Sequence, residues 1–232
     1  LLDLHPPRIF QIDGNLGGSA AVLGEDGNRT TVTIASGRQW AGKRTPGGDW
    51  LWILELPQDA SADLGDTPFI PSFIRHAIEC PMPVSVALYE GGTTPRVYVG
   101  YNPLMGASEI AAINGNTGAV DWTREQSRTA ADDSAVVIND VAADPSNGGV
   151  AACGDFRVEM TMDNIPGTVT AQDLAGSHKT ESKMFVLTYS RRGASGSYNH
   201  GGSDWCPDGE HNANHAASIV VGSAGQVYLG GY

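Results

Sequence analysis

The chain has few cysteines, few positive charges and no long apolar runs, and each shortage narrows the class of protein. Its three cysteines permit one disulfide and leave one thiol over. Only 14 lysines and arginines oppose 26 aspartates and glutamates, so the net charge is −12. Such an acidic surface repels phosphate backbones, and we expect no nucleic acid partner. No apolar run reaches the length of a transmembrane helix, and we expect no membrane span.

Glycine and proline are what the chain has in quantity. It holds 30 glycines and 13 prolines, while charged residues make up only 17% of its 232 residues. This composition is typical of many short strands joined by turns, rather than of helical bundles or disordered chains. We therefore expect a single all-β domain over residues 1–232, either complete or as a fragment of a larger one.

A short β-type run that closes on glycine recurs along the chain. Three copies are clear and one is looser: Arg96–Tyr101, Val150–Phe156, Val227–Tyr232 and, less regular, Thr31–Gly37. Most of them follow a turn. Repeats of this size indicate stacked or radial β-units. They therefore predict the class of fold independently of any single residue.

The segments between these runs suggest units of four strands. Residues 109–122 predict a β-hairpin around an Asn-Gly-type turn, with Trp122 on its second arm. Residues 136–144 form the next predicted strand, and a turn leads from it into the run ending at Gly154. The segments 183–189 and 217–221 repeat this order before the last run. The separation of Ile113 from Gly154 also equals that of Tyr189 from Gly230.

Four-stranded units in series predict an array of antiparallel blades like those of a β-propeller. The strand before each glycine-closing run and the run itself would form the inner pair of a blade, and the Asn-Gly-type hairpin the outer pair. The chain then holds about three blades and the inner half of another. Apolar residues at helical spacing also predict one short amphipathic helix near residues 70–79, packed against the rim of a sheet.

Three segments carry a resemblance to known repeats: Asp140–Phe156, Phe185–Gly193 and Ser218–Tyr232. They resemble the bacterial-type β-propeller repeats of secreted and surface proteins, with some likeness to PQQ-type propeller repeats. The resemblance covers residues 80–232 well and the first 80 residues poorly. It implies a propeller fold but no particular activity, because propellers carry many functions. No PQQ site is recognisable in the sequence.

A second resemblance lies near the N-terminus. The segment His5–Gly18 is similar to a motif of family 95 α-L-fucosidases, in which the residue matching Asp13 is catalytic. The chain departs from that motif by inserting Arg8 and Ile9, and the other catalytic residues of the family are absent. Residues 9–17 also align position by position with residues 110–118. We therefore favour a hairpin turn at Asp13, with a fucosidase-like acid or base as the alternative.

The polar segment from His200 to His215 is the best candidate for a metal site. Its candidate ligands are Asp204, Cys206, Asp208, Glu210, His211 and His215. The spacing of His211 and His215 suits Zn²⁺, with Cys206 or Asp208 as a third ligand. Its carboxylates and carbonyls would suit Ca²⁺. The alternative is a solvated loop, since no spacing here matches a strong metal signature.

Two covalent features complete the candidates. Cys80 and Cys206 lie in predicted loops and form the better disulfide pair, whereas Cys153 lies in a strand-like run and reads as a small buried residue. Asn28 begins an N-glycosylation sequon on a turn, which matters only for a protein secreted by a eukaryote.

Together these patterns predict an extracellular or cell-surface β-propeller segment with a structural or binding role and no catalysis. Its partners would be other segments of a parent chain, or further subunits, that complete the sheet, and glycans are candidate ligands for its tryptophans. The abrupt ends of the sequence suggest a processed product or fragment. The alternatives are a carbohydrate-active enzyme using Asp13 and a metal-dependent adhesion module using residues 204–215.

Overall fold

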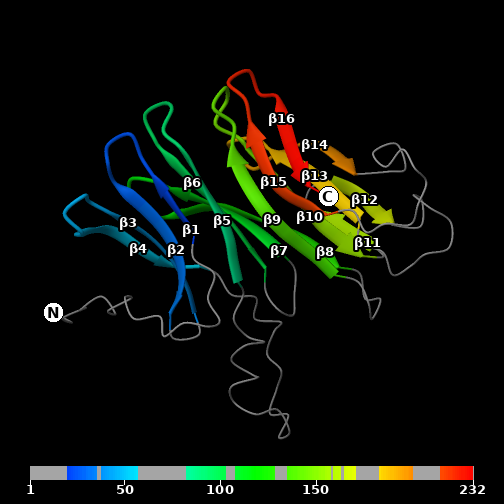
Figure 1. The fold of residues 1–232 in the computed structure, drawn as a ribbon, viewed down its shortest axis with the longest axis horizontal. Helices are drawn as coiled ribbons and strands as arrows, with labels where there is room; N and C mark the ends of the chain where they lie inside the picture. The colour runs from blue at the N-terminus through cyan, green and yellow to red at the C-terminus, as the bar shows by residue number, and fades with distance from the viewer. Residues whose placement is uncertain are drawn as a thin grey trace, which may run out of the picture.

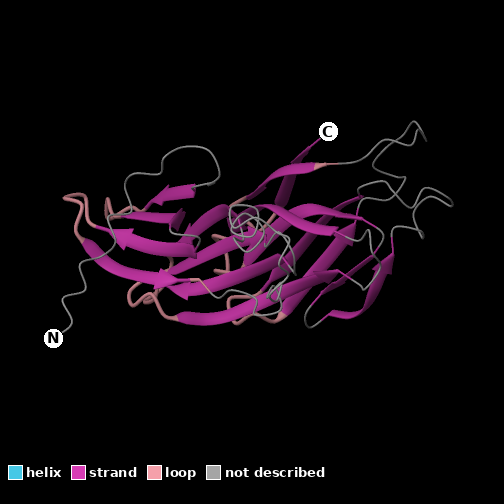
Figure 2. Cartoon of the chain, turned by 90° about the horizontal axis from the view of Figure 1, so that it is seen from below, coloured by secondary structure: helices cyan, strands magenta, loops and turns pink. Residues whose placement is uncertain are grey.

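Every regular element that the structure describes is a β-strand. The computed structural model of the chain describes residues 20–35, 38–56, 82–102, 108–128, 135–157, 159–162, 165–170, 183–200 and 215–231. Where the connection between two strands is itself described, it is a short turn or loop (Figure 2). The all-β prediction is therefore confirmed, and the helix expected near residues 70–79 lies outside the described residues. In the described ranges no helix is long and apolar enough to cross a membrane.

The first two sheets follow the chain strand by strand. The first sheet has the order β1-β2-β3-β4 and is antiparallel throughout, with bounds Ala20–Leu23, Arg29–Ala35, Arg38–Arg44 and Trp50–Glu55. The second sheet begins with the order β5-β6-β7-β8, with bounds Met82–Tyr89, Arg96–Asn102, Ser108–Asn114 and Val120–Arg128. Each sheet is therefore built by adding hairpins in chain order.

The third and fourth sheets keep this plan with one interruption. The third sheet runs β9-β10-β13-β14, with bounds Ala135–Ala143, Val150–Arg157, Lys183–Tyr189 and Ser195–His200. The fourth sheet contains β15 and β16, with bounds Ala216–Val221 and Val227–Gly231. Four-stranded antiparallel sheets are thus the repeating unit, and the fourth sheet has two strands in the described part of the chain.

The interruption is a hairpin that leaves the third sheet and joins the second. Strands β11 and β12, Glu159–Met162 and Ile165–Thr170, come between β10 and β13 in the sequence. β11 pairs antiparallel with β8, so the hairpin extends the second sheet to six strands. This pairing connects the two sheets through the main chain.

The sequence divides into sheets differently from the units predicted above. Residues 109–122 and residues 136–154 were expected to form one four-stranded unit. In the structure the first segment belongs to β7 and β8 of the second sheet, whereas the second segment supplies β9 and β10, which open the third sheet. The prediction of antiparallel pairing within each segment is correct, but the boundary between units lies two strands away. Turn chemistry specifies hairpins locally and does not say which hairpins share a sheet.

The first strand of each sheet lies beside the first strand of the next. β1 contacts β5, β5 contacts β9, and β9 contacts β15. The four sheets follow one another side by side along this line of first strands. They run from the first sheet, coloured blue, to the fourth sheet, coloured red (Figure 1). Neighbouring sheets therefore face one another, and each inner sheet must bury both of its faces.

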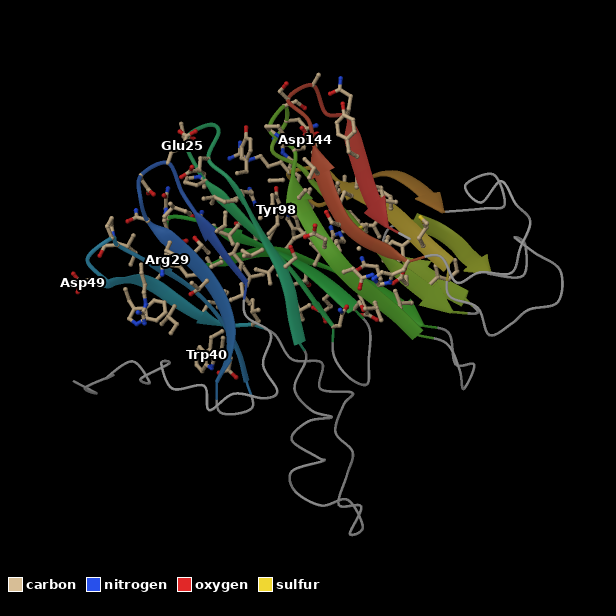
Figure 3. All side chains as sticks on the ribbon, in the orientation of Figure 1. Glu25, Arg29, Trp40, Asp49, Tyr98 and Asp144 are labelled. Atoms are coloured by element: carbon tan, nitrogen blue, oxygen red, sulfur yellow. The ribbon has the colours of Figure 1, made fainter. Side chains whose placement is uncertain are left out.

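Three apolar layers fill the spaces between the sheets. On β10, Val150 and Ala152 point toward the second sheet, whereas Ala151 and Cys153 point toward the fourth. This is the period-two alternation of a strand, with both sets buried. The largest layer, between the second and third sheets, includes Tyr98 at its centre (Figure 3). The layer under the two-stranded fourth sheet has the fewest buried residues.

The recurring glycine lies on the second strand of its sheet and allows the strands to approach closely. A Cβ atom at Gly154 would overlap the main-chain oxygen of Val137 on β9. A Cβ atom at Gly100 would lie 2.9 Å from Val141 Cγ1 of the next sheet. At Gly230, which occupies the same place in the repeat, the nearest atom would be 3.9 Å away. The glycine is thus required by packing in the second and third sheets and is tolerated in the fourth.

This difference gives a matched pair of variants. We expect Gly154→Ala to lower the free energy of unfolding by about 2–3 kcal/mol, because the added methyl group must displace main chain. Gly230→Ala should change it by less than about 0.5 kcal/mol. Urea denaturation of both variants measures the difference. Equal effects at the two positions would contradict the packing role of Gly154.

Candidate functional site

A bulge in β9 gathers polar side chains between three sheets. Asp140 pairs with Cys153 and Ile138 pairs with Gly154, so Asn139 is an extra residue on its strand. A bulge of this kind bends the strand and redirects its side chains. Polar groups are therefore placed inside the stack where a regular strand would bury apolar ones.

Asp140 binds the strands on both sides of β9. Its Oδ1 atom accepts a hydrogen bond of 2.5 Å from the Ser85 hydroxyl on β5, and its Oδ2 atom accepts one of 3.0 Å from the Ile219 amide on β15. Hydrogen bonds to an ionised carboxylate are stronger than those between neutral groups. One carboxylate thus connects the first strands of three successive sheets.

Asp155 makes a second connection between the third and fourth sheets. Its Oδ1 atom accepts a hydrogen bond of 3.0 Å from the Ala216 amide, and its Oδ2 atom accepts one of 2.7 Å from the Asn139 side chain. The same oxygen lies 2.6 Å from Nδ1 of His215. Asn139 also donates to the Ala216 carbonyl. These contacts hold the beginning of β15 against the third sheet.

The structure places one of the predicted metal ligands and leaves the others outside its description. His215 is described, and its Nδ1 atom faces Asp155. Asp204, Asp208, Glu210 and His211 lie outside the described residues, as does Cys206. Within the ranges that the structure does describe, no three histidine, cysteine or acidic side chains are grouped as metal ligands. The Ca²⁺ and Zn²⁺ proposals therefore remain predictions.

Cys153 is a buried free thiol between the two connecting carboxylates. Burial raises its pKa to about 12, and the negative charges of Asp140 and Asp155 add to the rise. A thiol that keeps its proton in this way is a poor nucleophile. The expectation that Cys153 acts as a small buried residue is confirmed. The pair Cys80 and Cys206 lies outside the described residues.

The raised pKa of Cys153 makes stability depend on pH in alkaline solution. In the unfolded chain the thiol loses its proton near pH 9, whereas in the folded chain it keeps the proton up to about pH 12. The unfolded chain then binds fewer protons, so the free energy of unfolding falls as pH rises between these values. We expect Cys153→Ala to make this fall shallower in urea denaturation at pH 8 to 11. Equal slopes for the two proteins would contradict the assignment.

Two tryptophans connect neighbouring sheets in the same way. Trp52 on β4 donates an indole hydrogen bond of 2.9 Å to the Gly115 carbonyl, in the β7–β8 turn of the second sheet. Trp122 on β8 donates one of 3.1 Å to the Arg191 carbonyl, in the β13–β14 turn of the third sheet. Both side chains therefore contribute to the packing of neighbouring sheets.

Each of these tryptophans also covers a glycine of the turn that it binds. A Cβ atom at Gly118 would lie 2.9 Å from the Trp52 ring, and one at Gly193 would lie 3.0 Å from the Trp122 ring. Both glycines have positive φ angles, 76° and 77°. An L-residue is therefore disfavoured at these positions by conformation and by contact. We call this repeated contact between tryptophan and turn the Trp–turn contact.

Replacing Trp52 tests the Trp–turn contact. We expect Trp52→Phe to lower the free energy of unfolding by about 2 kcal/mol, because the buried Gly115 carbonyl loses its indole donor. Trp50→Phe on the same strand is the control. Trp50 packs over Gly42 and the Arg44 guanidinium of its own sheet, so its replacement should cost under about 1 kcal/mol. Chemical denaturation compares the two; a larger loss for Trp50→Phe would contradict the contact.

A groove opens where the fourth sheet ends. It is a pocket of about 450 Å³ between the third sheet and β16. It is lined by Ala151 and Thr188 of the third sheet, by Val227 of β16, and by Arg191 and Arg192 of the β13–β14 turn. Asp144, whose turn lies at the upper edge of the sheets in Figure 3, also lines it. Residues of both the third and the fourth sheet therefore line this groove.

Three further residues, Asn28, Asp13 and Trp40, were candidates for glycosylation, catalysis and glycan binding. Asn28 lies just after the β1–β2 turn, where its side-chain amide donates a hydrogen bond of 2.5 Å to Asp26. Its glycosylation stays a prediction. Asp13 lies outside the described residues, so both the turn and the fucosidase interpretation stay predictions. Trp40 lies on the outer sheet of the stack (Figure 3), and a glycan contact there is likewise untested.

Sequence reasoning missed the residues that connect the sheets, namely Ser85, Asn139, Asp140 and Asp155. A signal for two of them was present, because Asn139 and Asp140 interrupt an otherwise apolar strand. Polar residues inside such a run must find hydrogen-bond partners when the strand is buried. The strands that supply those partners are set by which sheets face each other. The pattern of residues along one strand does not specify this.

Comparison with known proteins finds no protein-family model and no curated protein that matches the chain. The fold and the contacts of the described residues are therefore the basis for the function proposed below.

Proposed function

We propose that the chain is a sector of a β-propeller that serves as an extracellular structural or binding scaffold. The observation that carries this proposal is the succession of first strands, in which β5, β9 and β15 are connected through Asp140. In a propeller the first strands of successive blades surround one axis. A carboxylate that binds the first strands of neighbouring sheets supports such an arrangement.

The order of strands supports the same arrangement. Each four-stranded sheet is filled from its first strand outward, and the hairpin turns of neighbouring sheets meet at one end of the stack. The Trp–turn contact repeats from the first sheet to the second and from the second to the third. Among the described residues, two four-stranded sheets and the first four strands of the six-stranded sheet would correspond to three blades, and the two-stranded sheet to the inner half of another.

The use of buried polar groups supports a scaffold rather than a catalyst. Asp140 and Asp155 are occupied by hydrogen bonds from main-chain amides and neighbouring side chains. The buried thiol of Cys153 keeps its proton at neutral pH. A nucleophile needs an accessible group with an activating base, and these groups instead hold sheets together. The acidic, glycine-rich composition favours an extracellular or cell-surface location.

The outer face of the fourth sheet supports a role in binding further protein. Val220 and Tyr228 are directly paired across β15 and β16, and they are 58% and 62% exposed. In the inner sheets the corresponding layers between sheets are filled with apolar side chains. An exposed apolar pair at the end of the stack therefore suits contact with another sheet, supplied by a parent chain or a subunit.

The end-face contact can be tested by solution association. We expect the chain to self-associate with concentration, or to bind the dye ANS, because Val220 and Tyr228 are exposed. The double variant Val220→Lys, Tyr228→Lys should reduce both effects in sedimentation and fluorescence measurements. Val120→Lys, at a position 36% exposed on β8, is the control and should leave them unchanged. A chain that stays monomeric and binds no ANS would contradict the proposed end face.

A further inference from the structure

The first strand of the third sheet is bound along one edge by side chains rather than by a strand. In the described part of the chain β9 pairs with β10 alone, so its other edge has no pairing strand. β9 also contacts β5 and β6 of the second sheet. The amides and carbonyls on that edge need partners, because a buried main-chain group without a hydrogen bond is costly.

Asn102 on β6 binds both main-chain groups of one residue on this edge. Its Oδ1 atom accepts a hydrogen bond of 2.8 Å from the Ile138 amide, and its Nδ2 atom donates one of 2.6 Å to the Ile138 carbonyl. In an antiparallel ladder, a facing residue offers the same combination of one acceptor and one donor. The side-chain amide of Asn102 therefore takes the place of one residue of a pairing strand.

Two further side chains of the second sheet bind the β9–β10 hairpin. Ser108 on β7 donates a hydrogen bond of 2.6 Å to the Val136 carbonyl, two residues before Ile138. Main-chain groups two residues apart lie on the same edge of a strand. Tyr98 on β6 donates from its hydroxyl to the Gly148 carbonyl in the β9–β10 turn. The second sheet thus binds this hairpin at three successive points of its main chain.

A glycine in the middle of β6 brings β9 within reach of Asn102. Tyr98, Gly100 and Asn102 alternate along β6 on the side that faces the third sheet. A Cβ atom at Gly100 would lie 2.9 Å from Val141 Cγ1 and 3.0 Å from Ile138 Cγ2. A larger residue there would hold β9 farther from the sheet, so the glycine and the asparagine act together.

The first strand of the fourth sheet is held in the same manner by different groups. The Ala216 amide donates a hydrogen bond of 3.0 Å to Asp155 Oδ1, and the Ala216 carbonyl accepts one of 2.8 Å from the Asn139 side chain. Asp155 lies on β10 and Asn102 lies on β6, each the second strand of its sheet in chain order. A carboxylate and an amide here divide the two tasks that Asn102 performs by itself.

We propose that these side chains form a recurring main-chain clamp that positions the first strand of one sheet on the sheet before it. The main-chain clamp consists of Asn102 at β9 and of Asp155 with Asn139 at β15. This inference goes beyond the proposed function, because it concerns how successive sheets are held in register and requires neither a ring nor a partner. A slip of one residue turns the bound amide and carbonyl to the other edge of the strand, so each clamp favours a single register.

The main-chain clamp does not require a particular side chain on the strand that it binds. The two bound residues, Ile138 and Ala216, are both fully buried but differ greatly in size. The sequence must instead supply a donor and an acceptor on the preceding sheet. Asn102, Asp155 and Asn139 are therefore positioning residues, and their role is visible in the contacts between sheets rather than in the sequence repeat.

Amide hydrogen exchange of the whole chain tests the clamp at β9. In the unmodified protein we expect the Ile138 amide to exchange as slowly as the β9 amides that pair with β10, although no described strand pairs on its side. Asn102→Leu keeps the approximate shape of the side chain and removes both hydrogen bonds. The exchange rate of the Ile138 amide should then rise by about tenfold or more. Asn116→Leu, on the exposed part of the β7–β8 turn, is the control and should leave that rate unchanged.

The position of β9 is measured separately by nuclear Overhauser contacts. The close approach at Gly100 predicts contacts between its Hα atoms and the methyl groups of Ile138 and Val141. Asn102→Leu should weaken these contacts between sheets, while contacts between the paired strands β9 and β10 persist. Asn102→Ala should act in the same direction, and it keeps the test available if the leucine variant does not fold.

Asp155→Ala provides the reciprocal experiment at β15. It should raise the exchange rate of the Ala216 amide by about tenfold or more and leave that of the Ile138 amide unchanged. A general loss of stability would instead accelerate both amides in every variant. Equal acceleration of the two amides in Asn102→Leu and Asp155→Ala would therefore overturn the proposal. A rapidly exchanging Ile138 amide in the unmodified protein, or unchanged contacts of Gly100 in Asn102→Leu, would overturn it as well.

These outcomes are independent of the association measured through Val220 and Tyr228. If the exchange rates contradict the main-chain clamp while that association is observed, only the clamp is wrong. If the two amides respond separately, as expected, while the association is absent, the end-face contact of the proposed function is wrong instead.

Discussion

The close stacking of sheets through their first strands is the constraint on which the rest of the structure depends. β9 lies between β5 and β15 and pairs with β10, so strands of three sheets meet around it. The bulge at Asn139 and the lack of a Cβ atom at Gly154 allow the strands to approach this closely. Asp140 then joins three strands with one carboxylate. A charged group is acceptable there because its oxygens are used in hydrogen bonds.

From this centre outward, the contacts between sheets change in kind. Near the first strands they are carboxylates that bind main-chain amides, such as Asp155 with Ala216. Farther out they are apolar layers and then the Trp–turn contacts of Trp52 and Trp122. In the described part of the chain, the fourth sheet has carboxylate contacts to the third sheet near its first strand, through Asp140 and Asp155, but it has no Trp–turn contact. This is why both an exposed apolar face and a groove occur at the same end of the stack.

The hairpins were the most predictable part of the fold. The alternation of residues and the turn between Asn114 and Ala119 predicted β7 and β8, and the turn after Asp144 predicted β9 and β10. The division of these hairpins into sheets was wrong, and the connecting residues Ser85 and Asp155 were not foreseen. Both failures concern contacts between segments far apart in the sequence.

The sequence by itself determined where strands begin, where the chain turns and which neighbouring strands pair, because turn residues and side-chain alternation act over a few residues. Only the tertiary structure decided which hairpins share a sheet and which polar groups meet between sheets. His215 is an example, since its sequence neighbours suggested a metal ligand and its spatial neighbour is Asp155. Contacts such as this arise from the stacking of faces, and stacking depends on the shape and burial of whole sheets rather than on any local pattern.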